Sequence, residues 1–207
     1  MAVPDAGTLD GMPSTMTPPS LVLVRHGETT WNHDHLVQGH RDDAQLTERG
    51  VAQAHEAASA LREYDLDVIV SSDLRRAQHT ATIIASGRGL EVVTTPTLRE
   101  RAYGVYEGGF FADLPVSVAG FDGDVILDAD ARPPGGESLN DLYERAMRWL
   151  TQLRLDFAGA RVLVVTHGGT LRAIRAACAT TPIATTSWYP VDNASVWSTD
   201  LNGDPLG

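Results

Sequence analysis

Lysine is absent from this chain of 207 residues, and all 16 basic side chains are arginines. A chain without lysine cannot form a Schiff base, cannot hold pyridoxal phosphate through a lysine, and cannot use the lysine of a Walker A phosphate loop. If the protein handles phosphate, it must do so with arginine side chains, histidine side chains and backbone amides.

Cysteine, positive charge and long apolar runs are also scarce. A single cysteine, Cys178, excludes an internal disulfide and a metal site built from cysteines. No apolar run approaches the roughly 20 residues of a membrane span, and the first residues lack the arginine and apolar core of a secretory signal. The net charge of −11 repels phosphate backbones and anionic lipids. We therefore expect a cytoplasmic protein that binds neither nucleic acid nor membranes.

The composition is that of a globular domain, with 43% hydrophobic and 21% charged residues. A chain of this length can bury about 70% of the surface that its unfolded form exposes. Residues 1–19 are rich in proline and glycine and contain few large apolar side chains. We expect a disordered tail there and one domain over residues 20–207.

Apolar runs alternate with amphipathic stretches along this domain. The runs predict strands at 21–24, 68–70, 91–95, 161–166 and 194–199, and the stretches predict helices at 47–62, 74–85, 137–157 and 169–179. This alternation predicts an α/β fold, a three-layer α/β/α sandwich around a mostly parallel sheet. Ligands of such sheets bind beyond the carboxyl ends of the strands, so the polar residues after each strand are the candidates for a site.

Histidine and arginine follow three of these strands. The first strand leads into Arg25-His26-Gly27, the second is followed by Arg75-Arg76, and the fourth leads into His167-Gly168. Arginine forks bind phosphoryl oxygens in pairs, and glycine lets backbone amides approach a ligand. A lone histidine after a strand is more often structural than catalytic. Two His-Gly pairs, each directly after a buried apolar run, favour an anion site with a nucleophile inside it.

Seven short motifs follow one another along the chain. They are Arg25-His26-Gly27 with Glu28-Thr29, Leu46-Thr47-x-x-Gly50, Ser72-x-Leu74-x-Arg76-Ala77-x-x-Thr80, Leu98-x-Glu100, Tyr103-Gly104-x-x-Glu107-Gly108, Pro134-Gly135-Gly136-Glu137-Ser138 and Thr166-His167-Gly168-Gly169. In this order they resemble the histidine phosphatase superfamily, in its phosphoglycerate mutase-like branch. The resemblance implies the phosphoglycerate mutase-like form of the α/β sandwich. Within the family, the pattern of motifs is similar to that of the short broad-specificity phosphatases.

The resemblance implies a phosphoryl transfer in two steps. His26 resembles the nucleophile that becomes a phosphohistidine, Arg25 and Arg76 resemble the clamp on the phosphoryl oxygens, and His167 resembles a further donor to them. Glu100 resembles the acid that protonates the leaving group and then the base that activates water. Two neighbouring guanidinium groups would keep the nucleophilic histidine neutral, because they oppose a third positive charge.

The resemblance also implies secondary contacts around the phosphate. These come from Asn32, Gln38, Gly39 and Gly168, while Asn193 resembles a residue that orders the last strand near the site. No metal and no cofactor are expected, because the arginines supply the charge that Mg²⁺ would bring. The expected partner is a small phosphorylated substrate. Dimers are common among such folds, so a homodimer stays open as an alternative to a monomer.

Other polar residues have plainer interpretations. The histidines at 33, 35 and 40 admit a metal cluster as an alternative, but without a cysteine or a helix-spaced partner we expect them at the rim of the site. We expect Arg75 to lie at the surface or rim and Glu107 to support a loop.

Residues 109–133 and the C-terminal end bear on the choice between phosphatase and mutase. The segment holds one cation, Arg132, against five aspartates, which predicts repulsion of a second anionic group on the substrate. It also holds apolar residues, among them Phe110, Phe111 and Phe121, that suit either a neutral leaving group or a small core of the segment's own. Little chain follows the last predicted strand to close over the site.

We therefore expect a phosphatase that hydrolyses a small phosphorylated metabolite with a neutral or apolar leaving group. A cofactor-dependent phosphoglycerate mutase and a non-catalytic phosphate-binding module are the alternatives.

Overall fold

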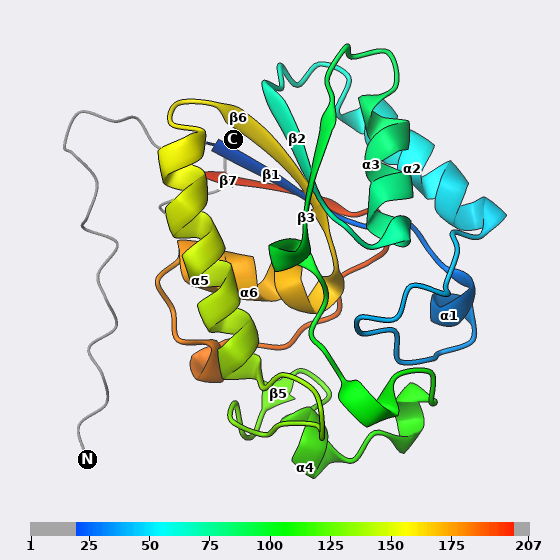
Figure 1. The fold of residues 1–207 in the computed structure, drawn as a ribbon, viewed down its shortest axis with the longest axis vertical. Coiled ribbons are helices and arrows are strands. Elements are labelled where there is room, and N and C mark those ends of the chain that lie inside the picture. The colour runs from blue at the N-terminus through cyan, green and yellow to red at the C-terminus, as the bar shows by residue number, and fades with distance from the viewer. Residues whose placement is uncertain (1–19, 201–207) are drawn as a thin grey trace.

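The computed structural model describes residues 20–200, so the predicted tail at 1–19 lies outside the described residues. Five strands form its central sheet (Figure 1), in the order β3 (Val92–Thr95), β2 (Val68–Ser72), β6 (Arg161–Thr166), β1 (Ser20–Arg25) and β7 (Val196–Asp200). The first four run parallel, and β7 pairs antiparallel with β1. The predicted mostly parallel sheet is confirmed.

Two pairs of helices cover the two faces of this sheet (Figure 1). On one face lie α2 (Glu48–Ala60) and α3 (Arg75–Ala85), and on the other lie α5 (Leu139–Asp156) and α6 (Gly168–Cys178). Successive residues of β1 enter the two cores in turn, because side chains of a strand alternate between faces. This explains why the strand is one unbroken apolar run, and it confirms the predicted three layers.

The helix starts follow from local capping. The Thr47 hydroxyl accepts a hydrogen bond from Gly50 N at 3.0 Å and so begins α2. The Ser138 and Asp141 side chains each accept a bond from the other's backbone amide, which begins α5 two residues after the predicted start.

Several short elements were not predicted. They are α1 (Thr30–His33), α4 (Val116–Ala119), the two-residue strands β4 (Phe121–Asp122) and β5 (Val125–Ile126), and 3₁₀ turns at Pro96–Leu98, Gly104–Tyr106, Phe111–Asp113 and Ile183–Thr185. The segment 109–133 does not form a separate core: Leu114 and Phe121 are buried in the same cluster as α5 and α6. None of the helices within residues 20–200 is both long enough and apolar enough to cross a membrane.

Candidate active site

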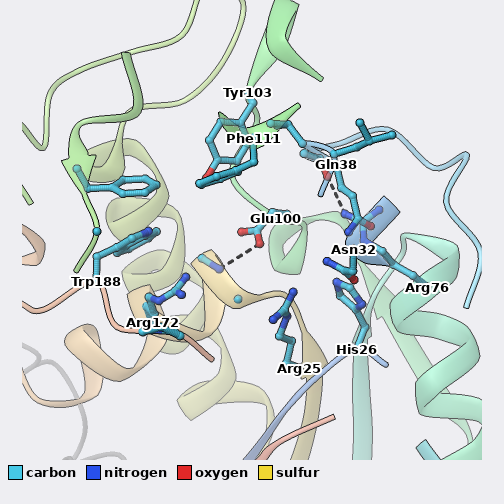
Figure 2. A pocket seen from close by; sticks show the side chains of 18 residues that line it. Arg25, His26, Asn32, Gln38, Arg76, Glu100, Tyr103, Phe111, Arg172 and Trp188 are labelled. Atoms are coloured by element: carbon cyan, nitrogen blue, oxygen red, sulfur yellow. Dashed lines mark hydrogen bonds between the residues drawn. The ribbon is translucent and has the colours of Figure 1, made fainter. Parts of the chain in front are cut away.

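A pocket of about 320 Å³ lies beyond the carboxyl ends of β1 and β6 (Figure 2). Every residue expected to catalyse or to bind the phosphate lines it except His167. The lining consists of Arg25, His26, Asn32, Leu36, Val37, Gln38, Gly39, Arg76, Glu100, Tyr103, Phe111, Phe121, Gly123, Gly168, Gly169, Arg172, Trp188 and Pro190. The parallel strands therefore do bring their C-terminal polar residues to one place.

His26 follows β1 and is 3% exposed. Its Nδ1 lies 2.8 Å from the carbonyl oxygen of Gly27, which can only accept, so Nδ1 carries the proton. The lone pair is then on Nε2. Burial, followed by the charges of Arg76 and Arg25, holds the pKa of His26 well below its usual value. The imidazole is thus neutral at neutral pH, as a nucleophile must be.

Arg76 sits in the first turn of α3 and is 1% exposed. It donates to Gly39 O at 2.7 Å, to Arg41 O at 2.8 Å and, through Nε, to His167 Nδ1 at 3.2 Å. Burial lowers the pKa of Arg76 to about 10, which leaves the guanidinium charged at neutral pH. Three fixed hydrogen bonds hold this cation against the pocket.

Arg25 faces the pocket from the end of β1. It donates to the carbonyl oxygen of Val191, while its buried Nε has no hydrogen-bond partner among the atoms that the structure describes. The buried Oε1 of Gln38 likewise has none. Buried polar atoms are nearly always bonded, so two unsatisfied ones in the wall of one pocket indicate a site that a polar ligand completes.

His167 is fully buried behind these residues. Because its Nδ1 accepts from Arg76, its Nε2 carries the proton and donates to Ser72 Oγ at 2.9 Å. Burial and the charge of Arg76 hold its pKa well below the usual value, and its ring centre lies 5.1 Å from that of His26. In this arrangement His167 orients Arg76. Its expected role as a donor to the phosphoryl group stays a prediction, since it requires the Ser72 bond to be exchanged.

Glu100 is held at the N-terminus of α6. Its Oε2 accepts from Gly169 N at 3.0 Å, and its Oε1 accepts from Thr170 N at 3.2 Å and Arg101 N at 2.8 Å. A β-carbon at position 169 would lie 2.4 Å from Oε1, so only glycine allows this approach. The carboxylate is thereby fixed in the middle of the pocket (Figure 2).

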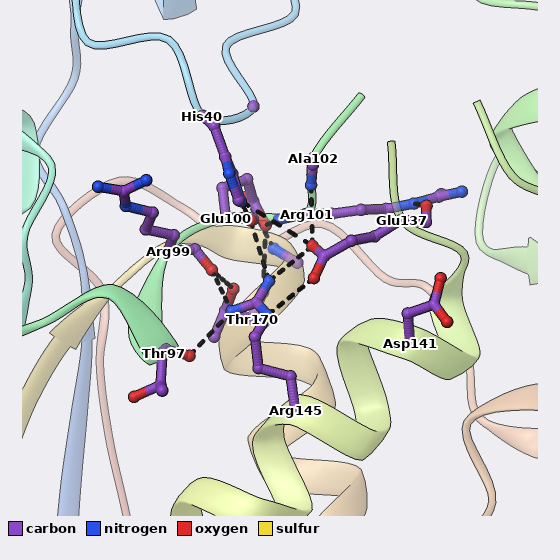
Figure 3. A network of polar contacts seen from close by, with 12 residues as sticks. His40, Thr97, Arg99, Glu100, Arg101, Ala102, Glu137, Asp141, Arg145 and Thr170 are labelled. Atoms are coloured by element: carbon purple, nitrogen blue, oxygen red, sulfur yellow. Dashed lines mark hydrogen bonds and ion pairs between the residues drawn. The ribbon is translucent and has the colours of Figure 1, made fainter. Parts of the chain in front are cut away.

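A second set of contacts fixes the backbone that carries Glu100 (Figure 3). Arg145, on α5, donates to the carbonyl oxygens of Thr97 and Arg99 at 2.8 Å each and of Glu100 at 3.1 Å. The edge formed by its Nε and Nη2 also donates to the two carboxylate oxygens of Glu137, at 2.9 and 2.8 Å. Glu137 of the Pro-Gly-Gly-Glu-Ser motif therefore holds Arg145 in place, and Arg145 in turn holds the backbone at Glu100.

Asn32 and Asn193 join the first and last parts of the site. Asn193 Nδ2 donates to His26 O at 3.1 Å and to Asn32 Oδ1 at 3.3 Å. Asn32 Oδ1 also accepts from the Thr29 amide at 3.2 Å. The carbonyl end of Asn32 is thus occupied by protein, which leaves its amide nitrogen for a ligand.

Two of the plainer interpretations are consistent with the structure. The Arg75 side chain is 78% exposed and pairs with Asp42, so it is Arg76 that faces the pocket. Glu107 accepts from the backbone amides of His40 and Tyr103 and so supports a loop.

The expectation for the three loop histidines is corrected. His33 is exposed and pairs with Asp34, His40 bonds to the Glu100 carbonyl oxygen at 2.8 Å, and none of the three, His35 included, lines the pocket. Among the side chains of residues 20–198, no three histidine, cysteine, aspartate or glutamate side chains gather as a metal ligand set.

The prediction that the aspartates of residues 109–133 face the substrate is also wrong. None of the five aspartates lines the pocket; the segment contributes Phe111, Phe121 and Gly123 instead. The positive charge at the end of the pocket remote from His26 comes from Arg172. Neither Arg172 nor Trp188 was predicted to lie in the site. Arg172 lies one helical turn after Gly168, and that spacing was the available signal.

Comparisons with known proteins agree with this geometry. The sequence model of the Histidine phosphatase superfamily (branch 1) matches residues 21–205. A 2,3-bisphosphoglycerate-dependent phosphoglycerate mutase of Methylobacterium radiotolerans is 43% identical over 164 residues, which are 74% of this chain and 76% of the relative.

Solved structures of phosphatases share the fold. A mycobacterial glucosyl-3-phosphoglycerate phosphatase has a TM-score of 0.76 at 34% identity, over 87% of this chain and 92% of its own. The alpha-ribazole phosphatase of Shigella flexneri has a TM-score of 0.75 at 30% identity, over 86% of this chain and 89% of its own.

Proposed function

Because the chain belongs to the histidine phosphatase superfamily, branch 1, we propose that it is a phosphomonoester hydrolase that acts through a phosphohistidine at His26. The observation that carries the proposal is the state of His26: a buried, neutral imidazole with its proton on Nδ1, in a pocket that Arg25 and Arg76 also line. A small phosphorylated metabolite is the proposed substrate.

The first step transfers the phosphoryl group to the protein. Glu100 takes up a proton as the substrate binds. Nε2 of His26 then attacks phosphorus, the bond between phosphorus and the leaving oxygen breaks, and Glu100 gives that proton to the leaving oxygen. The charge on the transferring group spreads over its equatorial oxygens, where Arg25 and Arg76 are already held in place. In the second step a water molecule attacks phosphorus, Glu100 takes its proton, the P–N bond breaks, and inorganic phosphate leaves.

Hydrolysis is favoured over mutase activity by the far end of the pocket. A bisphosphate cofactor would place a second phosphoryl group there, opposite a single guanidinium, whereas the His26 end offers two arginines together with Asn32 and Gln38. The phosphatases among the solved relatives support the same choice. The mutase stays the alternative, because the curated relative that is 43% identical is named a mutase.

One preparation of the protein can separate the two activities. Release of inorganic phosphate from p-nitrophenyl phosphate and 3-phosphoglycerate is measured beside the conversion of 3-phosphoglycerate to 2-phosphoglycerate primed with 2,3-bisphosphoglycerate. We expect phosphate release to be the faster, and to persist in excess EDTA because arginine supplies the positive charge. If 3-phosphoglycerate is isomerised faster than any of the esters is hydrolysed, the protein is a mutase and not a phosphatase. If EDTA abolishes the activity and Zn²⁺ or Mg²⁺ restores it, the reaction depends on a metal ion.

A further inference from the structure

Arg172 is the one cation at the end of the pocket remote from His26 among the residues described. It stands on α6, where its Nε donates to Tyr189 O at 2.6 Å and its guanidinium lies over the Trp188 ring, 4.6 Å from the ring centre. These two contacts fix the plane of the guanidinium. Among the described side chains, which run from residue 20 to residue 198, no carboxylate lies within ion-pair distance of it.

The rings of Trp188 and Tyr189 attract this cation through their faces, but they do not neutralise its charge. It shares the pocket wall with Tyr103, Phe111 and Trp188. Burial lowers the pKa of Arg172, and the more distant charge of Glu100 only partly offsets that effect. A buried guanidinium without an ion-pair partner is completed by an outside group of opposite charge, which adds to the attraction of the aromatic rings.

Its place relative to the phosphoryl site limits the size of that group. A β-carbon added at Gly168 would lie 3.5 Å from Arg172 Nη1 and 3.6 Å from Arg25 Nε, so the two guanidiniums flank one glycine. Figure 2 shows Arg172 and Trp188 on one side of Glu100, with His26 and Arg76 on the other. A leaving group of a few carbon atoms can therefore reach Arg172 while its phosphate is at His26.

We infer that Arg172 binds a carboxylate on the leaving group, so that the substrates are small phosphorylated carboxylic acids. This inference rests on the proposed phosphatase function. One guanidinium with a fixed plane matches the two oxygens and the single charge of a carboxylate. A second phosphoryl dianion would need more donors than this end of the pocket provides. The aromatic side chains pack against the carbon skeleton between the two anionic groups.

The test compares two phosphomonoesters that differ at one group. 3-Phosphoglycerate carries a carboxylate where glycerol 3-phosphate carries a neutral hydroxymethyl group. Their kcat and KM are measured for the wild type, Arg172→Gln, Arg172→Lys and Arg148→Gln. Arg148 is the matched control, because it is an exposed arginine on α5 whose partner is Glu144 at the surface.

In the wild type we expect a preference for 3-phosphoglycerate. Arg172→Gln should lower kcat/KM for 3-phosphoglycerate by about 10- to 100-fold more than for glycerol 3-phosphate. Most of this change should be in KM, because the carboxylate is bound alike before and during the reaction. Arg172→Lys should keep part of the preference, since it retains the charge and loses the fork. Arg148→Gln should keep all of it.

Equal losses for the two esters in Arg172→Gln, or no preference in the wild type, would overturn the inference. The same holds if 3-phosphoglycerate inhibits p-nitrophenyl phosphate hydrolysis no better than glycerol 3-phosphate does. The failure of the proposed function has a different signature, because the wild type would then release phosphate from none of the three esters. Folding of each variant is checked by its thermal unfolding curve.

Discussion

Replacing Arg76 separates the phosphoryl clamp from its neighbour in the sequence. Arg75 and Arg76 are adjacent and equally charged, but the Arg75 side chain is 78% exposed and Arg76 is 1% exposed with three hydrogen bonds to fixed groups. Because its pKa is about 10, Arg76 carries its full charge at pH 7. It therefore meets the requirement for a preorganised donor, and its neighbour does not.

The expected size of the effect follows from this difference. Removal of one preorganised donor to a developing negative charge costs about 10²- to 10³-fold in rate. We expect Arg76→Ala to lower kcat/KM for p-nitrophenyl phosphate by about that factor, and Arg75→Ala to lower it by less than about threefold, as for an exposed ion pair. Arg76→Lys should recover only part of the loss, since an ammonium cannot make the three bonds of the fork.

Part of the loss in Arg76→Ala could reflect the loop rather than the clamp, because Gly39 O and Arg41 O would lose their donor. Millimolar guanidinium added to the assay distinguishes the two. It should restore part of the activity of Arg76→Ala and leave that of Arg75→Ala unchanged. Equal losses in the two alanine variants, with both still folded, would show that the clamp has been placed wrongly.

Two further predictions concern pH and the position of Glu100. The fold holds the pKa values of His26 and His167 well below their values in the unfolded chain. As the pH falls, the unfolded state therefore binds more protons than the folded state. The free energy of unfolding should fall by about 1 kcal/mol per histidine from pH 7 to 5.5. Urea titrations at both pH values should show a smaller fall in His26→Asn, and an equal fall would contradict the assignment. Gly169→Ala places a β-carbon 2.4 Å from Glu100 Oε1 and so displaces the carboxylate. It should lower kcat about as much as Glu100→Gln does, on the order of 10²-fold. Full activity in Gly169→Ala would mean that this position of the carboxylate is not needed.

The parts of the fold with a strong periodic pattern could be predicted from the sequence. The apolar run of β1 alternates between two cores, and the Thr47 cap begins α2 where expected. The elements that were missed are short. For example, α1 has four residues and β4 has two. Such elements are too short to show a hydrophobic period in the sequence, and they depend on tertiary contacts.

The phosphoryl end of the site could be predicted, and the leaving-group end could not. His26 directly follows β1, and Arg76 lies in the first turn of the helix after β2, at the edge where ligands of parallel sheets bind. Arg172 lies inside an amphipathic helix and resembles a surface arginine by its pattern, while Trp188 reaches the pocket from a loop that no pattern placed. The aspartates of residues 109–133 were expected at the pocket because the sequence gives their charge but not the direction of their side chains.

The claim that His26 carries the phosphoryl group is tested most directly by trapping the intermediate. The protein is mixed with a ³²P-labelled phosphomonoester and quenched within the first turnovers, and the labelled peptide is identified. We predict one label on His26, stable in base and labile in acid, and none in His26→Gln. An acid-stable label, or a label on any other residue, would contradict the mechanism.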